Sequence, residues 1–163
     1  MAAGSALVKL RPAVPGDANK VADIWHRGWQ DGHLGFVPQD LVEARTEGSF
    51  WTRASERVSD TTVGIVNGEI AGFIMVVDDE VEQVYVSDHH RGTGVAAALM
   101  AEAERQVKSS GYARAWLAVV AGNARARAFY ARAGWHDEGM IDYAASARGG
   151  PIPVPAHRYT KAV

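Results

Sequence analysis

The sequence contains no cysteine among its 163 residues. This absence excludes disulfide bonds, thiolate metal ligands and a cysteine nucleophile, and it is compatible with a reducing compartment. Long hydrophobic runs are also missing, because the longest nearly apolar stretch, Val95–Ala101, falls far short of the roughly 20 residues that a membrane-spanning helix needs. Met1–Leu10 lacks the basic start and apolar core of a signal peptide. We therefore expect a cytoplasmic protein that does not bind membranes.

The charges of the chain are nearly balanced. Seventeen lysines and arginines against 19 aspartates and glutamates give a formal net charge of −2 and an isoelectric point near 6.3. No overall positive field would gather nucleic acid or anionic lipid, so neither is an expected partner. Hydrophobic residues make up 47% of the chain and charged residues 22%, as in folded globular proteins. The length fits one domain, spanning residues 1–163.

Turn residues and hydrophobic spacing predict an alternation of strands and helices. Val21 and Trp25 recur at helical spacing, and Asn67-Gly68 is a typical hairpin turn between two β-branched runs. This order indicates an α+β fold around a mixed sheet. The expected elements are, in chain order, a strand at Leu7–Arg11, a helix that Asp17 caps and that runs to about Gln30, a helical region within Gln39–Arg57, strands at Thr61–Val66, Glu69–Val77 and Glu80–Val86, a helix from Val95 that Gly111 ends, a strand at Tyr112–Val120, a helix that Asn123 caps and Gly134 closes, and strands near Trp135–Tyr143 and Val154–Thr160 that flank an irregular loop at Ser146–Pro155.

A strand, a glycine turn and a helix start follow one another in Val84–Ala97. The turn contains Gly92 and Gly94 beside Arg91. The first amides of a helix are unpaired and carry the positive end of its dipole, and glycines let a phosphate approach the backbone. The segment lacks the Lys-Ser/Thr ending of a Walker loop and the third glycine of the dinucleotide motif. It predicts a pyrophosphate site, with an ordinary strand-to-helix turn as the alternative.

A second pattern lies in Asn123–Trp135. Together with Arg91–Ala96 it resembles the GNAT acetyltransferase superfamily, which carries an Arg/Gln-x-x-Gly-x-Gly/Ala loop and, later, an Asn-x-x-Ala-x-x-Phe-Tyr-x-x-x-Gly-Phe pattern. A weaker resemblance extends to Leu10–Asp17. The chain departs from the family at Asp88, where proline is common, and at Trp135, where phenylalanine is common. The resemblance implies a GNAT-like fold, in which helices flank a central mixed, mostly antiparallel sheet.

The resemblance also implies acetyl-CoA as cosubstrate, in the cleft between the strands Glu80–Val86 and Tyr112–Val120. The amide of Val86 would polarise the thioester carbonyl. Asn123 resembles the family residue that contacts the pantetheine arm, with a plain helix cap as the alternative, and Tyr130 resembles the residue that protonates the departing thiolate, with a core aromatic as the alternative. The residues expected at the cosubstrate are Val84, Tyr85, Val86, Arg91, Gly92, Thr93, Gly94, Val95, Ala96, Ala97, Asn123 and Tyr130.

Amine acetylation also requires a base. An alkyl amine with a pKa near 10.4 is only about one part in a thousand neutral at pH 7. Glu82 is the first candidate, because strict alternation along its strand places it on the face shared by Val84 and Val86. A buried carboxylate there would have a raised pKa suited to the task. A surface or structural glutamate is the alternative.

Aromatic residues gather on and after the first expected helix. The cluster consists of Trp25, His26, Trp29 and His33. In the family this region helps to wall the acceptor site, so an aromatic wall is expected to pack an apolar or cationic acceptor, with core packing as the alternative for either tryptophan. His33 could titrate near neutral pH, with an incidental histidine as the alternative. The adjacent His89 and His90 point apart on extended chain, and no carboxylate spacing completes a ligand set. We therefore predict no metal site.

These features predict an acyltransferase enzyme, an acetyl-CoA dependent N-acetyltransferase. Without cysteine or an activated serine, the amine is expected to attack directly in a ternary complex. The acceptor is a primary amine of a small molecule or of a protein N-terminus. One alternative is a non-catalytic CoA-binding sensor or interaction module, and another is a phosphate- or nucleotide-binding protein. By the same resemblance, a homodimer through paired C-terminal strands stays open.

Overall fold

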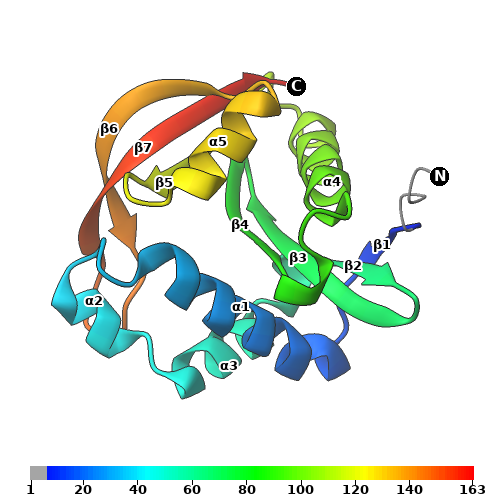
Figure 1. The fold of residues 1–163 in the computed structure, drawn as a ribbon, viewed down its shortest axis with the longest axis horizontal. Coiled ribbons are helices and arrows are strands. Elements are labelled where there is room, and N and C mark those ends of the chain that lie inside the picture. The colour runs from blue at the N-terminus through cyan, green and yellow to red at the C-terminus, as the bar shows by residue number, and fades with distance from the viewer. Residues whose placement is uncertain (1–6) are drawn as a thin grey trace.

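The computed structural model describes residues 7–163 and contains a seven-stranded sheet in the order β1-β2-β3-β4-β5-β7-β6 (Figure 1). All neighbouring strands are antiparallel except β4 and β5, which are parallel. The mixed, mostly antiparallel sheet is therefore confirmed. The strands are β1 (Lys9–Pro12), β2 (Thr61–Val66), β3 (Glu69–Val77), β4 (Glu80–Val86), β5 (Arg114–Val120), β6 (His136–Ala145) and β7 (Ile152–Ala162). The helices are α1 (Ala18–His33), α2 (Gln39–Ala44), α3 (Glu47–Glu56), α4 (Val95–Ser109) and α5 (Ala124–Arg132), with short 3-10 turns at Pro15–Asp17, Val58–Asp60 and Asp88–His90.

Two hydrophobic clusters cover the two faces of the sheet. Phe73 and Met75 of β3 belong to the cluster that contains α1 and α3, whereas Ile74 belongs to the cluster that contains α4. Successive residues of a strand point to opposite faces, so α1 and α3 cover one face and α4 the other. Among residues 7–163, no helix is both long and apolar enough to cross a membrane.

The strands β4 and β5 diverge after one paired position. Glu80 and Trp116 are the only register partners between them, and the Trp116 amide also donates to the Asp79 carbonyl at 3.0 Å. β5 instead pairs along its whole length with β7. The described sheet is therefore split between β4 and β5, beyond Glu80, and this split positions the site.

A β-bulge interrupts β4. Gln83 pairs with Met75 of β3, but Val81 pairs with Val76, so Glu82 is an extra residue without a partner in the ladder. A bulge adds one residue to one strand and turns the side chains on either side of it out of strict alternation.

The N-terminal half differs from the prediction in two places. Asp17 stands at the N-cap position of α1 but makes no capping hydrogen bond; its carboxylate forms an ion pair with Arg11 at 2.7 Å and accepts the Val14 amide at 2.8 Å. The predicted cap is therefore wrong, because the carboxylate instead pairs with Arg11 of β1 and with the Val14 amide. The helical region at 39–57 consists of two helices, and Arg45 lies between them, before the N-cap Thr46 of α3.

The turn predictions hold, and the C-terminal loop is shorter than expected. Asn67 and Gly68 both have positive φ, of 51° and 79°, as a two-residue hairpin requires. The irregular loop ends before Ile152, because Pro153 and Pro155 are part of β7. Both prolines pair with β6 only, since β5 joins β7 from Ala156 onward, so no ladder bond is lost on the other side.

Candidate active site

A cavity of about 350 Å³ lies between the end of β4, the turn before α4 and one face of α5. Most of the residues expected at the cosubstrate line it, which brings together three segments that are distant in the sequence. The predicted residues that line it are Val84, Tyr85, Val86, Arg91, Gly92, Gly94, Ala96, Ala97, Asn123 and Tyr130. We call this space the cosubstrate cavity.

Two predicted residues turn their side chains elsewhere. The Thr93 hydroxyl donates to the carbonyl of His90 and so holds the turn. Val95, the first residue of α4, is fully buried in the cluster around that helix. Neither side chain lines the cosubstrate cavity; each supports the shape of the turn.

The turn before α4 fits a phosphate group. Gly92 and Gly94 have φ of 74° and 88°, a conformation that side chains other than glycine rarely adopt. A Cβ added at either glycine would meet no atom within 4 Å, so the space beside the backbone is open. The first amides of α4 follow at once, and a 15-residue helix gives them the positive end of its dipole.

Several residues of the cosubstrate cavity were not predicted. Arg125, Phe129 and Arg132 follow one another at helical spacing on α5, which places them on one face of the helix. The i, i+4, i+7 spacing of these residues in the sequence could have predicted their shared face. Arg91, which was predicted, forms an ion pair with Asp31 of α1 at 2.7 Å. The other cavity residues that were missed are Gly28, Gly32, His90 and Ala126.

A second cavity, of about 150 Å³, opens from the split between β4 and β5 toward α1 and α3. We call it the acceptor cavity, after the role that the resemblance implies for the region of Trp25, Trp29 and His33, which line it. Its polar lining includes Glu80, Glu82, Arg45 and Arg53. The residues that line both cavities are Val84, Tyr85, Asn123, Ala126 and Tyr130, so the two spaces meet at the start of α5.

Tyr130 lies at this junction. Its ring packs against Trp135 and Tyr159, with centroids 6.3 Å and 6.1 Å away. Burial raises the pKa of Tyr130, so its phenol stays protonated at neutral pH. Within residues 7–163 its hydroxyl makes no hydrogen bond, which leaves the proton available to a ligand in either cavity.

Asn123 combines two positions. Its Oδ1 accepts the Ala126 amide at 3.2 Å, so the cap of α5 is confirmed. The same side chain lines both cavities.

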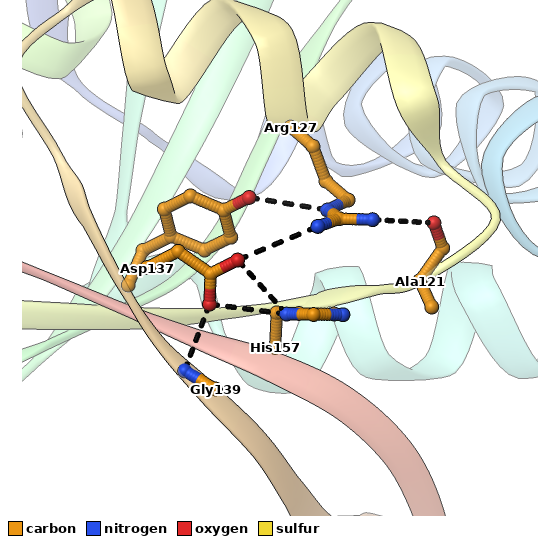
Figure 2. A network of polar contacts seen from close by, with 6 residues as sticks. Ala121, Arg127, Asp137, Gly139 and His157 are labelled. Carbon is orange, nitrogen blue, oxygen red and sulfur yellow. Dashed lines mark hydrogen bonds and ion pairs between the residues drawn. The ribbon is translucent and has the colours of Figure 1, made fainter.

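An arginine on α5 fixes this helix to the last two strands (Figure 2). Arg127 donates to the Tyr159 hydroxyl at 3.1 Å, to the Ala121 carbonyl at 3.2 Å and to Asp137 at 3.4 Å. Asp137 in turn contacts Nδ1 of His157 at 3.0 Å. These contacts join α5 to β6, β7 and the residue that follows β5, and so restrain the helix that carries the buried phenol.

Glu82 does not lie where alternation predicts. Val84 and Val86 pack on the α4 side, whereas the Glu82 carboxylate forms a bidentate ion pair with Arg57, the residue that follows α3 on the other side. The predicted shared face is wrong because Glu82 is the bulged residue of β4. Its carboxylate nevertheless lines the acceptor cavity.

Glu80 is a second carboxylate of the acceptor cavity, and it was not predicted. The Tyr143 hydroxyl donates to it at 2.6 Å. Burial raises the pKa of Glu80 above its ordinary value, because the charged form loses solvation. Its place two residues before Glu82 was the available signal, but its contact with Tyr143 depends on how distant strands meet.

The aromatic residues of α1 pack against one another and against rings of α3 and β3. Trp25 is fully buried against Phe50 and Phe73. Trp29 stacks on His33 with centroids 5.0 Å apart, and its carbonyl accepts Nδ1–H of His33 at 3.0 Å. Burial lowers the pKa of His33 to about 4, so the imidazole is neutral at pH 7. These rings form the wall of the acceptor cavity and part of the core.

Comparison with known proteins agrees with this geometry. The model of the acetyltransferase (GNAT) family matches residues 20–135. An uncharacterised N-acetyltransferase of Mycobacterium tuberculosis is 36% identical over 78 residues, which are 45% of this chain and 50% of that protein. The chain thus spans about half the length of the curated relatives that it matches.

Solved structures share the fold over almost the whole chain. A GCN5-related N-acetyltransferase of Rhodopseudomonas palustris has a TM-score of 0.75 and 20% identity, covering 100% of this chain and 99% of the other. The PaiA N-acetyltransferase of Thermoplasma acidophilum, solved with coenzyme A, has a TM-score of 0.69 and 15% identity, covering 96% of this chain and 99% of the other. Acetyl-CoA is the cosubstrate of the family whose model matches. Because that model covers most of its length, this chain belongs to the GNAT acetyltransferase family.

Proposed function

We propose that the protein transfers an acetyl group from acetyl-CoA to a primary amine by direct attack in a ternary complex. One observation carries the proposal: a cavity with a turn suited to phosphate and a cavity with two carboxylates meet at Tyr130, whose protonated hydroxyl has no hydrogen-bond partner among residues 7–163. Acetyl transfer requires the cosubstrate, the acid and the acceptor amine to lie next to one another.

The cosubstrate would bind along one continuous surface. The amides of Gly92–Ala97 would hold the pyrophosphate, and Arg125 and Arg132 would add positive charge at the phosphates. Beyond Glu80, β4 lacks β5 as a neighbour, so the edge at Val84–Val86 is available to the amide groups of the pantetheine arm. The Val86 amide and the Asn123 side chain are proposed contacts at the thioester end.

Tyr130 is proposed as the acid. Acetyl-CoA supplies the acetyl group as a thioester, whose cleavage leaves a thiolate with a conjugate acid near pKa 8.5. A phenol that burial keeps protonated can donate a hydrogen bond or its proton to that sulfur. Its contribution would fall mainly in the transition state.

Glu82 is proposed as the base that takes the proton from the amine, directly or through water. It lies nearer than Glu80 to the thioester end of β4, and Arg57 holds its carboxylate in one orientation. Glu80 is the alternative base, because burial raises its pKa and it forms no ion pair with another described residue. Separate substitution of each glutamate by glutamine would distinguish them.

A screen of amines with acetyl-CoA would test the proposed function, with thiol release and the mass of the acceptor as readouts. Thiol release that depends on both protein and amine, together with an acetylated acceptor, would support it. The competing function is a CoA-binding module without transfer. Tight binding of CoA without thiol release for any amine would favour that module.

A further inference from the structure

Arg45 is a buried cation without a carboxylate partner among residues 7–163. It lies in the break between α2 and α3, is 8% exposed and lines the acceptor cavity. In the described part of the chain its guanidinium takes part in no ion pair and donates no hydrogen bond. Burial lowers the pKa of Arg45, as expected when solvation is lost without a compensating anion.

Arg53 of α3 is a second cation of the same cavity, and it is partly buried. Its guanidinium lies 4.3 Å from the ring centroid of Trp25, which fixes its orientation. No described carboxylate forms an ion pair with it. Burial and the nearby positive charge of Arg45 lower the pKa of Arg53 to about 10. The two arginines therefore line one space, and the positive charge of Arg45 disfavours the protonation of Arg53.

The carboxylates of the cavity are already engaged. Glu82 is in the bidentate pair with Arg57, which also contacts Asp60 at 3.5 Å. Glu80 accepts the hydroxyl of Tyr143. His33 is neutral, so it adds no further positive charge. The acceptor cavity thus holds two guanidinium groups whose anion is absent from the described chain.

We propose that the acceptor is an amino carboxylic acid, whose carboxylate binds between Arg45 and Arg53 while its amine points toward Glu82 and Tyr130. The inference rests on the proposed function. Guanidinium groups match the geometry of a carboxylate and pair with it through charge-assisted hydrogen bonds. A volume of about 150 Å³ suits a compact acceptor, because pockets for drug-sized ligands usually measure about 300–1,000 Å³. The two glutamates would repel a doubly charged phosphate more than a carboxylate.

Matched acceptors provide the first test. Each amino acid is compared with its carboxamide and with the amine that remains after decarboxylation, under saturating acetyl-CoA. We expect kcat/KM to be at least about tenfold higher for the carboxylate than for either neutral counterpart, since one charge-assisted pair accounts for such a factor. Arg45→Met should lower this preference about tenfold or more, and Arg45→Lys should restore part of it. Arg105→Met, at an exposed arginine on α4, is the control and should keep the preference.

Thermal stability distinguishes an arginine that binds the acceptor from one that the fold requires. Without acceptor, Arg45→Met should melt at the wild-type temperature or above, because it removes an unpaired buried charge. An N-acetylated amino acid added to the CoA-loaded protein should raise the melting temperature of the wild type, and that of Arg45→Met much less. A clear loss of stability in Arg45→Met without ligand would assign this arginine to the fold and overturn the inference.

The inference and the proposed function can fail separately. Turnover of neutral amines as fast as, or faster than, their carboxylates would overturn the inference and leave acetyl transfer in place. An equal loss for all acceptors in Arg45→Met would also overturn it. Absence of turnover for every amine, with Arg45-dependent binding of an N-acetylated amino acid in preference to its amide, would retain the carboxylate site and reject transfer.

Discussion

Gly32 of α1 lies so close to Asn123 that a Cβ built at position 32 would stand 2.8 Å from the Nδ2 atom of Asn123. One turn earlier, a Cβ at Gly28 would stand 2.4 Å from the ring of Tyr85. Two glycines on one face of a helix allow this close approach, because any side chain would fill the gap. They allow α1 to pack closely against Tyr85 and Asn123, which line both cavities.

Gly32→Ala should therefore disturb the site although alanine favours helices. We expect weaker CoA binding and a loss of about 1–3 kcal/mol in the free energy of unfolding, because the added methyl group must displace Asn123. Gly48→Ala is the control, since Gly48 lies in α3 with no atom within 4 Å of its Cβ position. That control should be neutral or stabilised. Chemical denaturation and calorimetry with CoA measure both quantities; wild-type values for Gly32→Ala would contradict the packing argument.

Gly94→Glu should abolish most of the affinity for CoA. The substitution places bulk and negative charge beside the first amides of α4, where the pyrophosphate is expected. Gly94→Ala is compared with it, because both variants carry the same strain of a positive φ, about 1–2 kcal/mol. The difference between the two dissociation constants isolates charge and bulk. Equal affinities in two folded variants would place the pyrophosphate elsewhere.

Tyr130→Phe should separate packing from catalysis. The ring contacts with Trp135 and Tyr159 survive, so the melting temperature and CoA affinity should stay at the wild-type values. We expect turnover to fall by about ten- to a thousandfold, the effect of removing a group that acts in acid–base chemistry. Rates measured with the best acceptor decide the matter. A folded Phe variant with the wild-type rate would make Tyr130 a core aromatic only.

The two glutamates of the acceptor cavity should differ in their pH dependence. Glu82→Gln should lower turnover near neutral pH and recover in part at higher pH, where more of the amine is already neutral. Glu80→Gln should leave the rate near that of the wild type if Glu82 is the base. The reverse result would assign the base to Glu80, and unchanged profiles in both variants would exclude a carboxylate base.

Glu80 also carries a prediction on stability. Its pKa is raised in the folded protein, so its contribution to the stability is greatest below its unfolded pKa and is lost as the pH rises through the folded value. The stability of Glu80→Gln relative to the wild type, measured as the difference in free energy of unfolding, should therefore increase as the pH rises from acidic to neutral. Denaturation curves at several pH values test this sign. An increase in the relative stability of the variant as the pH falls would contradict the burial argument.

Local signals in the sequence predicted most of the fold. The Asn67-Gly68 turn, the bounds of β4 and the cap at Asn123 all depend on neighbouring residues, and all are confirmed. The glycine turn and the α5 motif likewise led to the cosubstrate cavity. These features need no knowledge of distant contacts.

The acceptor side could not be predicted in the same way. The bulge at Glu82 exists only in the pairing of β4 with β3, so alternation along one strand gave the wrong face. Arg45 lies between α2 and α3, and Arg53 lies in α3, so both reach the cavity through tertiary packing, and no local pattern marks them as facing one space. Whether a charge has a partner depends on tertiary contacts, so residue spacing in the sequence cannot predict it.

The single paired position between β4 and β5 has a consequence for motion. Strands β1–β4 and strands β5–β7 form two ribbons, which the backbone ladder joins only at Glu80 and Trp116. An extended pantetheine arm laid along Val84–Val86 would act as a surrogate strand and bridge the seam between them. Amide hydrogen exchange along that seam should therefore slow when CoA binds, so that the cosubstrate completes the architecture that catalysis uses.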